Sequence, residues 1–132
     1  MPVRGIRGAT VADADHPEAI LSATRELLTR VCLANPSLQK ENIASVLFTV
    51  TNDLQSVYPA QAARQLGWDS IPLMCAMEIP VPGGLSHCIR VLIHWNTDLP
   101  QEAIRPVYLG AAVSLRPDIY RTDSMNNKSE GV

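Results

Sequence analysis

The stretch of residues 88–95 limits the possible folds more than any other part of the sequence. Its length and β-branched content favour a strand over a helix. Strand alternation places Cys88, Arg90, Leu92 and His94 on one face and Ile89, Val91, Ile93 and Trp95 on the other. Because a guanidinium keeps its proton and an unpaired buried charge is very costly, Arg90 needs a partner in this apolar run. That partner is a carboxylate, such as Glu78 or Asp98, or an anionic ligand, and the residues alone leave both open.

The size and composition fit one globular domain. The chain has 132 residues, of which 46% are hydrophobic and 18% are charged, so it can bury a substantial core. Its net charge of -2 argues against nucleic acid as a partner, since proteins that bind phosphate backbones are usually basic. With one Phe and three Tyr, a platform for stacking bases is not expected either.

The cysteines and the N-terminal residues favour a cytoplasmic location. Three cysteines, Cys32, Cys75 and Cys88, are an odd number, which is typical of reduced thiols, and no Cys/His spacing indicates a metal site. The N-terminal residues lack the apolar region of a signal peptide, and no apolar stretch approaches the length of a membrane span. We therefore expect a cytoplasmic protein that binds neither metal nor membrane.

Hydrophobic periodicity predicts an α+β domain. The sequence indicates strands at 3–11, 43–51, 72–79, 88–95 and 107–109, with helices at 17–34 and 59–66. Asp15 is the expected cap of the long helix, Asn35-Pro36 its end, and Gly67 the end of the short one. Residues 100–102 predict a single helical turn, whereas 111–115 are ambiguous. Two helices can cover only one face of a mixed sheet, so the other face favours oligomerisation.

Several residues besides Arg90 are candidates for a site, each with a plainer interpretation. Arg7 lies beside Gly8, which leaves room near the guanidinium, but it can equally be an exposed strand residue. Cys75 is most often a small buried hydrophobe in such a context, and it joins Glu78 at one site only if their strand twists or bulges. Tyr108 fits a core or interface position, and Arg116 fits a solvated segment near the end of the chain.

Taken together, the motifs closely resemble the AroH-type monofunctional chorismate mutases, the α+β class of these enzymes. The resemblance runs from about residue 3 to residue 118 and rests on short segments in a fixed order. These segments are Arg4-Gly5-Ile6-Arg7-Gly8-Ala9, Val57-Tyr58-Pro59-Ala60-Gln61-Ala62-Ala63-Arg64, Cys75-Ala76-Met77-Glu78, Ile89-Arg90-Val91, Asn96-Thr97-Asp98, Val107-Tyr108-Leu109 and Leu115-Arg116-Pro117-Asp118. The resemblance implies a catalytic domain at 1–118, and the polar composition of the remaining residues predicts a flexible tail at 119–132.

The resemblance also implies the reaction, which is the Claisen rearrangement of chorismate to prephenate on the route to phenylalanine and tyrosine. It further implies a homotrimer, a trimeric pseudo-barrel with helices outside and active sites between subunits, that uses no cofactor or metal. Arg90, Glu78 and Arg7 would be the catalytic residues. The substrate would also meet Cys75, Tyr108, Arg64, Arg116, Tyr58, Ala60, Gln61, Leu73, Met74 and Leu115. Gln61 stands where a basic residue can occur in the family, and Tyr58 stands where Phe is common.

Two other functions remain open on the sequence. One is an imine or enamine deaminase of similar fold, which would also hold a carboxylate with an interface arginine. The other is a non-catalytic trimer that binds carboxylic acids of the aromatic pathway without turning them over.

Overall fold

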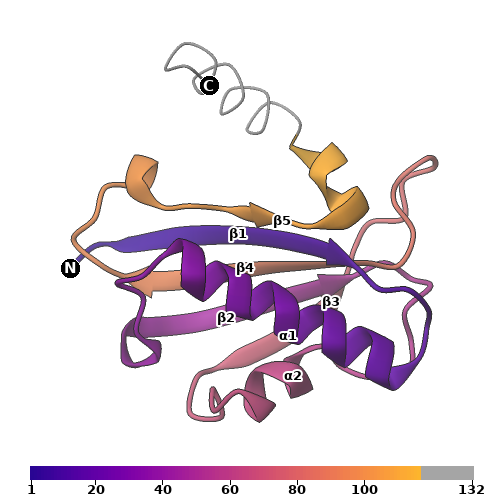
Figure 1. The fold of residues 1–132 in the computed structure, drawn as a ribbon, viewed down its shortest axis with the longest axis horizontal. Helices are drawn as coiled ribbons and strands as arrows, with labels where there is room; N and C mark the ends of the chain where they lie inside the picture. The colour runs from indigo at the N-terminus through magenta and orange to yellow at the C-terminus, as the bar shows by residue number, and fades with distance from the viewer. Residues whose placement is uncertain (117–132) are drawn as a thin grey trace.

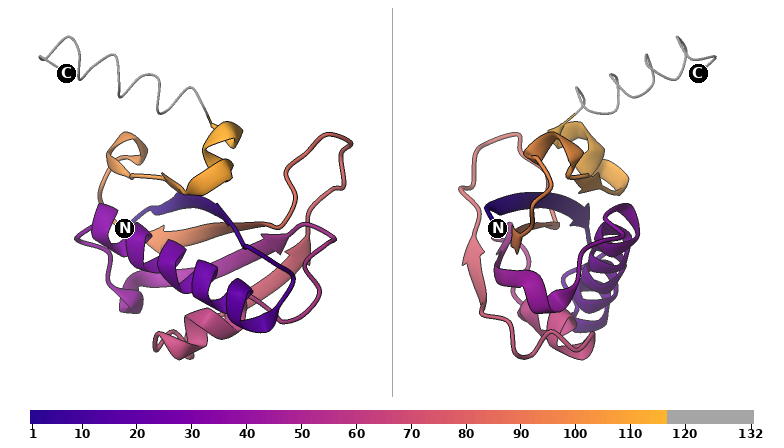
Figure 2. Two further views of the ribbon diagram at one scale, coloured as in Figure 1. Left: turned by 45° about the vertical axis from the view of Figure 1, so that its right-hand side comes forward. Right: turned by 90° about the vertical axis from the view of Figure 1, so that its left-hand side faces the viewer.

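The computed structural model of the chain describes residues 1–116, and the chain folds into a mixed five-stranded sheet with both helices on one side (Figures 1 and 2). The strands lie in the order β3-β2-β4-β1-β5. Strand β4 is antiparallel to β1 and β2, whereas β3 and β5 add to the two edges as parallel strands. The helices and strands are β1 (Val3–Val11), α1 (Pro17–Ala34), β2 (Ile43–Val50), α2 (Ala60–Gln65), β3 (Leu73–Met77), β4 (Cys88–Asn96) and β5 (Val107–Tyr108). The predicted α+β class is confirmed.

Short 3-10 helices connect the strands and clarify two of the sequence predictions. They are η1 (Lys40–Asn42), η2 (Gln101–Ala103) and η3 (Gly110–Leu115). The helical turn expected at 100–102 is η2, shifted by one residue, and the ambiguous segment 111–115 is most of η3. Strand β3 is shorter than the expected 72–79: it begins after Pro72, which has no N–H to donate, and it ends at Met77, although the Glu78 N–H still bonds to Val50.

The long helix α1 follows its predicted bounds but not its predicted cap. Its N-cap is His16, whose Nδ1 accepts a hydrogen bond from the Glu18 N–H at 3.3 Å. The carboxylate of Asp15 instead accepts three hydrogen bonds, from the N–H groups of Gln55 and Ser56 and from the Ser56 hydroxyl. These donors come from the loop before α2. Together they give Asp15 more hydrogen bonds than it would accept as the N-cap of α1.

The inner face of the sheet and the helices enclose the main core. From β4, the residues Ile89, Val91, Ile93 and Trp95 all point inward and are almost completely buried, as the alternation predicted. Strand β2 contributes Val46 and Phe48, and α1 adds leucines from its buried stripe. Gly8 also faces inward, where a Cβ would lie 3.2 Å from Leu27 Cδ1 and 3.1 Å from Val91 Cγ1. Gly8 therefore allows α1 to pack closely against the sheet. The sequence had suggested instead that Gly8 leaves room beside the Arg7 guanidinium.

Within residues 1–116, no α-helix covers the outer face of the sheet (Figure 2). The register places Arg7, Thr49, Arg90 and Leu92 on this face, and the segment η3 packs against β1 at one side of it. In the part of the chain that the structure describes, no helix is long and apolar enough to cross a membrane. The tail expected at 119–132 lies outside the described residues.

Candidate active site

Arg90 projects from the middle of β4 onto the outer face of the sheet. Its side chain is 46% exposed, so the expectation that it sits buried in an apolar run is wrong for the single chain. Only alternate residues of β4 point inward, and Arg90 belongs to the other set. Its partner is Glu78 and not Asp98, with Nε of Arg90 3.5 Å from Oε2 of Glu78.

Strand β2 holds Glu78 at two points. The backbone N–H of Glu78 donates to the carbonyl of Val50 at 2.8 Å, just beyond the end of β3. The Thr49 hydroxyl donates to Oε2, the same oxygen that approaches Arg90. Thr49 is also the residue paired with Arg90 across the ladder. Thr49 is not among the site residues expected from the sequence, although it lies on the face of its strand opposite the buried Val46 and Phe48.

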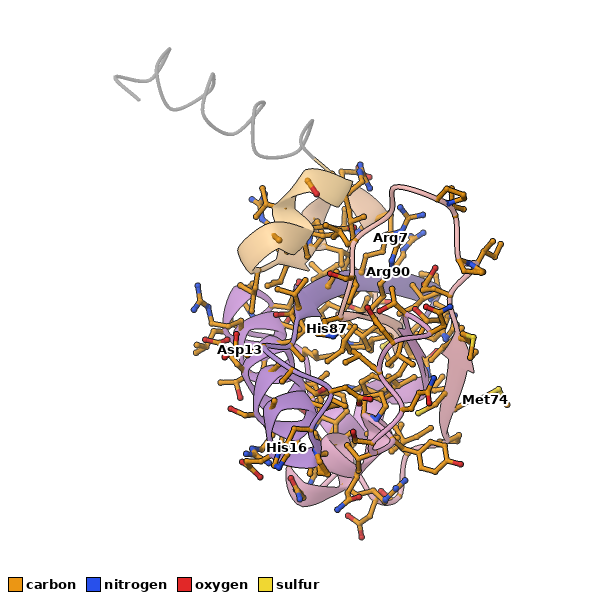
Figure 3. All side chains as sticks on the ribbon, turned by 90° about the vertical axis from the view of Figure 1, so that its right-hand side faces the viewer. Arg7, Asp13, His16, Met74, His87 and Arg90 are labelled. Atoms are coloured by element: carbon orange, nitrogen blue, oxygen red, sulfur yellow. The ribbon has the colours of Figure 1, made fainter. Side chains whose placement is uncertain are left out.

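Arg7, Arg90 and Arg116 line one cavity of about 340 Å³ on the outer face. Its floor includes Leu47, Thr49 and Leu92, and its far side is formed by Tyr108 and Leu115. Arg7 and Arg90 lie close together on this face (Figure 3). Within residues 1–116 the ion pairs join carboxylates to Arg25, His87 and Arg90, and none reaches Arg7. The cavity has the size of a small-molecule site, and its arginines favour a ligand with more than one carboxylate.

Tyr108 is almost fully buried where β5 meets η3. It packs with Ala9 and Ala112, and Leu115 lies against the same cluster. The β5 strand is held in place by Asn35 at the end of α1, whose amide bonds to both the N–H and the carbonyl of Arg105. The aromatic ring is therefore a fixed wall of the cavity.

A second hollow of about 530 Å³ opens on the other side of Arg90, beneath the loop that joins β3 to β4. Glu78, Cys88 and Arg90 line it from the sheet side, and residues 79–81 and 83–86 line it from the loop. Burial raises the pKa of the Cys88 thiol, although the charge and hydrogen bond of Arg90 act in the opposite direction. The Arg90 guanidinium thus lies between two cavities.

The remaining predicted residues form a separate group around β3 and α2. Tyr58, Gln61, Arg64 and Met74 are exposed, whereas Ala60, Leu73 and Cys75 pack against the core. A cavity of about 500 Å³ between β3 and residues 54–59 is lined by Tyr58 and Cys75. Strand β3 is three places from β1 in the sheet, which corresponds to about 14 Å. Met74 accordingly lies well apart from Arg7 and Arg90 (Figure 3).

Cys75 does not join Glu78 within one chain. The two face opposite sides of the sheet, since Cys75 pairs with the inward-facing Phe48 and Glu78 bonds to the outward-facing Thr49. Burial raises the pKa of the Cys75 thiol more than the Ala60 N–H and the Arg64 charge lower it. A protonated thiol is a poor nucleophile. Cys75 therefore lacks the properties that covalent catalysis would require.

No metal site is recognisable in the described part of the chain, where no three His, Cys, Asp or Glu side chains gather suitably. The chemistry that the outer-face cavity offers is electrostatic. It presents guanidinium groups and a buried phenol to a small anion, and the Glu78 carboxylate lies beside Arg90 at the second hollow.

The family model described as chorismate mutase type I matches residues 3–119. The chain belongs to this family. It is 56% identical over 117 residues to chorismate mutase AroH of Thermus thermophilus, covering 89% of this chain and 96% of that protein. It is 45% identical over 123 residues to chorismate mutase AroH of Bacillus subtilis strain 168, covering 92% and 96%. The solved chorismate mutase from Clostridium thermocellum has a TM-score of 0.79 at 45% identity, covering 82% of this chain and 96% of that one.

Membership of the chorismate mutase type I family decides among the functions that the sequence left open. The relatives and the structural neighbour are all described as chorismate mutases, so neither the deaminase nor the non-catalytic binder is favoured. The family resemblance inferred from the sequence is confirmed.

Proposed function

We propose a set of roles for the site residues in the reaction that this enzyme catalyses, the rearrangement of chorismate to prephenate in aromatic amino-acid biosynthesis. The reaction is unimolecular and needs no nucleophile, general acid or general base. An enzyme can accelerate it by holding the dianion in a compact conformer and by stabilising charge as the ether C–O bond breaks. The arginines beside the outer-face cavity suit both tasks.

Arg90 stabilises the charge that develops on the ether oxygen. This proposal is supported by its position between the two cavities and by its partial exposure on the outer face. A guanidinium is permanently charged and presents several donors in a fixed plane, so it can contact the ether oxygen and a carboxylate together. Glu78, which lies beside it, accepts a hydrogen bond from the ring hydroxyl of the substrate.

Arg7 holds the side-chain carboxylate of the substrate, with Tyr108 beside it. Arg116 and Leu115 close the same cavity, and Arg116 attracts the dianion to it. The group around β3, which comprises Tyr58, Ala60, Gln61, Arg64, Leu73, Met74 and Cys75, forms the opposite wall. Its distance from Arg7 and Arg90 within one chain supports a cleft shared by two subunits.

The enzyme acts as a homotrimer in the cytoplasm. The uncovered outer face and the β3 edge of the sheet support assembly, because Met74, Met77 and Ile79 at this edge are large apolar side chains exposed in the single chain. In a closed ring of three, the β3 side of each subunit meets the Arg90 side of the next, and one cleft forms at each contact.

The deciding experiment follows the absorbance of chorismate with the purified enzyme and with Arg90→Ala. We expect turnover by the wild type and a loss of about two to three orders of magnitude in kcat for the variant, since it lacks a preorganised donor. Arg25→Ala is the matched control, because Arg25 pairs with Glu18 on the helical side of the protein. Near-full activity of Arg90→Ala would contradict its assigned role.

A further inference from the structure

We propose that Thr49 is a positioning residue, which decides how Glu78 and Arg90 face each other and so keeps both available to the substrate. This inference rests on the proposed function, since it deepens the roles of the same two residues. The observation that carries it is that one oxygen of Glu78, Oε2, receives the Thr49 hydroxyl and also lies nearest to Arg90.

The geometry of the ion pair is unusual for a carboxylate beside an arginine. The closest approach joins Oε2 to Nε at 3.5 Å, so the terminal nitrogens of Arg90 lie farther from the carboxylate. An unrestrained pair prefers the bidentate arrangement, in which both oxygens meet two guanidinium nitrogens at shorter distances. Such an arrangement would neutralise the donors that the substrate needs.

Thr49 is placed to prevent the bidentate arrangement. It is paired with Arg90 across the ladder, lies on the same face, and lines the cavity with Arg7 and Arg90. Its hydroxyl hydrogen bond to the Glu78 carboxylate is charge-assisted and holds Oε2 toward β2. Because the Glu78 N–H is also bound to Val50 on β2, the whole residue is fixed from one strand.

Two groups remain available to the ligand as a result. Within residues 1–116, no hydrogen bond reaches Oε1 of Glu78, so this oxygen can accept the ring hydroxyl. The terminal nitrogens of Arg90 are left to meet the dianion. Without the Thr49 hydroxyl, Glu78 can turn onto those nitrogens, and the substrate must then compete with it.

The test compares Thr49→Val, which removes the hydroxyl at nearly constant shape, with Thr49→Ser, which keeps it. We expect Thr49→Val to raise KM about tenfold, the size of one hydrogen bond to a charged group, with kcat within about twofold. Thr49→Ser should stay near the wild type. A merely structural defect would lower kcat through a smaller active fraction and would leave KM unchanged.

Two further variants test whether the effect of Thr49→Val on KM arises through Glu78. In the Glu78→Gln background, Thr49→Val should change KM by less than about twofold, because the amide forms no ion pair to compete with the substrate. Ser45→Ala removes a hydroxyl on the same strand and face, where Ser45 bonds to His94 instead, and it should retain wild-type kinetics. Sedimentation of each variant verifies that assembly is intact.

Several results would overturn the proposal. These are an unchanged KM in Thr49→Val, an equal loss in Thr49→Ser, and an undiminished effect in the Glu78→Gln background. A crystal structure of Thr49→Val provides a measurement that does not depend on turnover. It should show the Glu78 carboxylate moved onto the terminal nitrogens of Arg90, and an unmoved carboxylate would refute the inference. Absence of turnover in the wild type would instead contradict the proposed function.

Discussion

Arg90 and Cys75 show how position on a strand decides the chemistry of a single residue. Both occur in apolar runs, yet Arg90 faces outward beside two cavities and Cys75 faces inward against the core. Burial raises the pKa of the Cys75 thiol and leaves it protonated, whereas a guanidinium keeps its charge in any setting. The residue that can act by electrostatics is therefore always charged, and the one that could act by covalent attack is held as a protonated thiol.

Gly8 gives a stability prediction at the scale of one residue. A Cβ at this position would lie between 3.1 and 3.3 Å from Val91, Leu27 and the carbonyl of Val107, so neighbours crowd it on several sides. We expect Gly8→Ala to lower the free energy of unfolding by about 1–3 kcal/mol through overpacking. Gly5→Ala is the matched control, since its Cβ would meet only Leu92, at 3.4 Å. Urea denaturation compares the two, and equal stabilities would contradict this account of α1 packing.

At the scale of elements, the edges of the sheet are fixed by side chains that bind backbone groups of distant segments. Asp15 binds the loop before α2, and Asn35 binds the segment before β5. These two loops carry Tyr58 and lead to Tyr108, which belong to the two halves of the proposed cleft. The walls of the proposed cleft are thus set by connections far from Arg90.

The start of β4 depends on Asp53 in a similar way, which gives a prediction about pH. Burial works to raise the pKa of the Asp53 carboxyl, but hydrogen bonds from Thr51 and from the His87 N–H outweigh it and hold that pKa below the ordinary 3.8. A carboxyl whose pKa is lowered by folding stabilises the fold at pH values above its pKa in the unfolded chain. This contribution is lost as the pH falls through its pKa in the folded state. His87 adopts a positive φ of 52°, so its backbone needs this support.

Asp53→Asn should therefore be less stable than the wild type at pH 5–7, and the difference should shrink as the pH falls below about 4. Urea denaturation between pH 3 and pH 7 measures the free energy of unfolding of each. Asp98→Asn, at an exposed turn, is the control for removing a carboxylate that anchors no backbone group within residues 1–116. A difference that stays constant down to pH 3 would show that the Asp53 charge is not what stabilises the start of β4.

Considered as a whole molecule, the fold was largely predictable because its signals are local. The alternation of β4, the stripe of α1 and the stop at Gly67 each depend on neighbouring residues, and all were confirmed. The predicted N-cap of α1 was wrong, because Asp15 binds partners some 40 residues away. The site was predictable mainly through family resemblance. Only the sheet order shows that Thr49, Glu78 and Arg90 meet, since they come from three different parts of the chain.

The separation of the two residue groups leads to the last prediction, which concerns the assembled molecule. If each cleft takes Arg90 from one subunit and the β3 wall from its neighbour, two different inactive variants can restore each other. Arg90→Ala removes the donor, and Met74→Asp puts a negative charge on the exposed wall, where it repels the dianion. When equal amounts are unfolded together and reassembled at random, about a quarter of the clefts combine both intact halves. We expect the mixture to recover about that fraction of wild-type kcat, with each variant reassembled alone as the control. Recovery no greater than that of the separate variants would place the whole site within one chain.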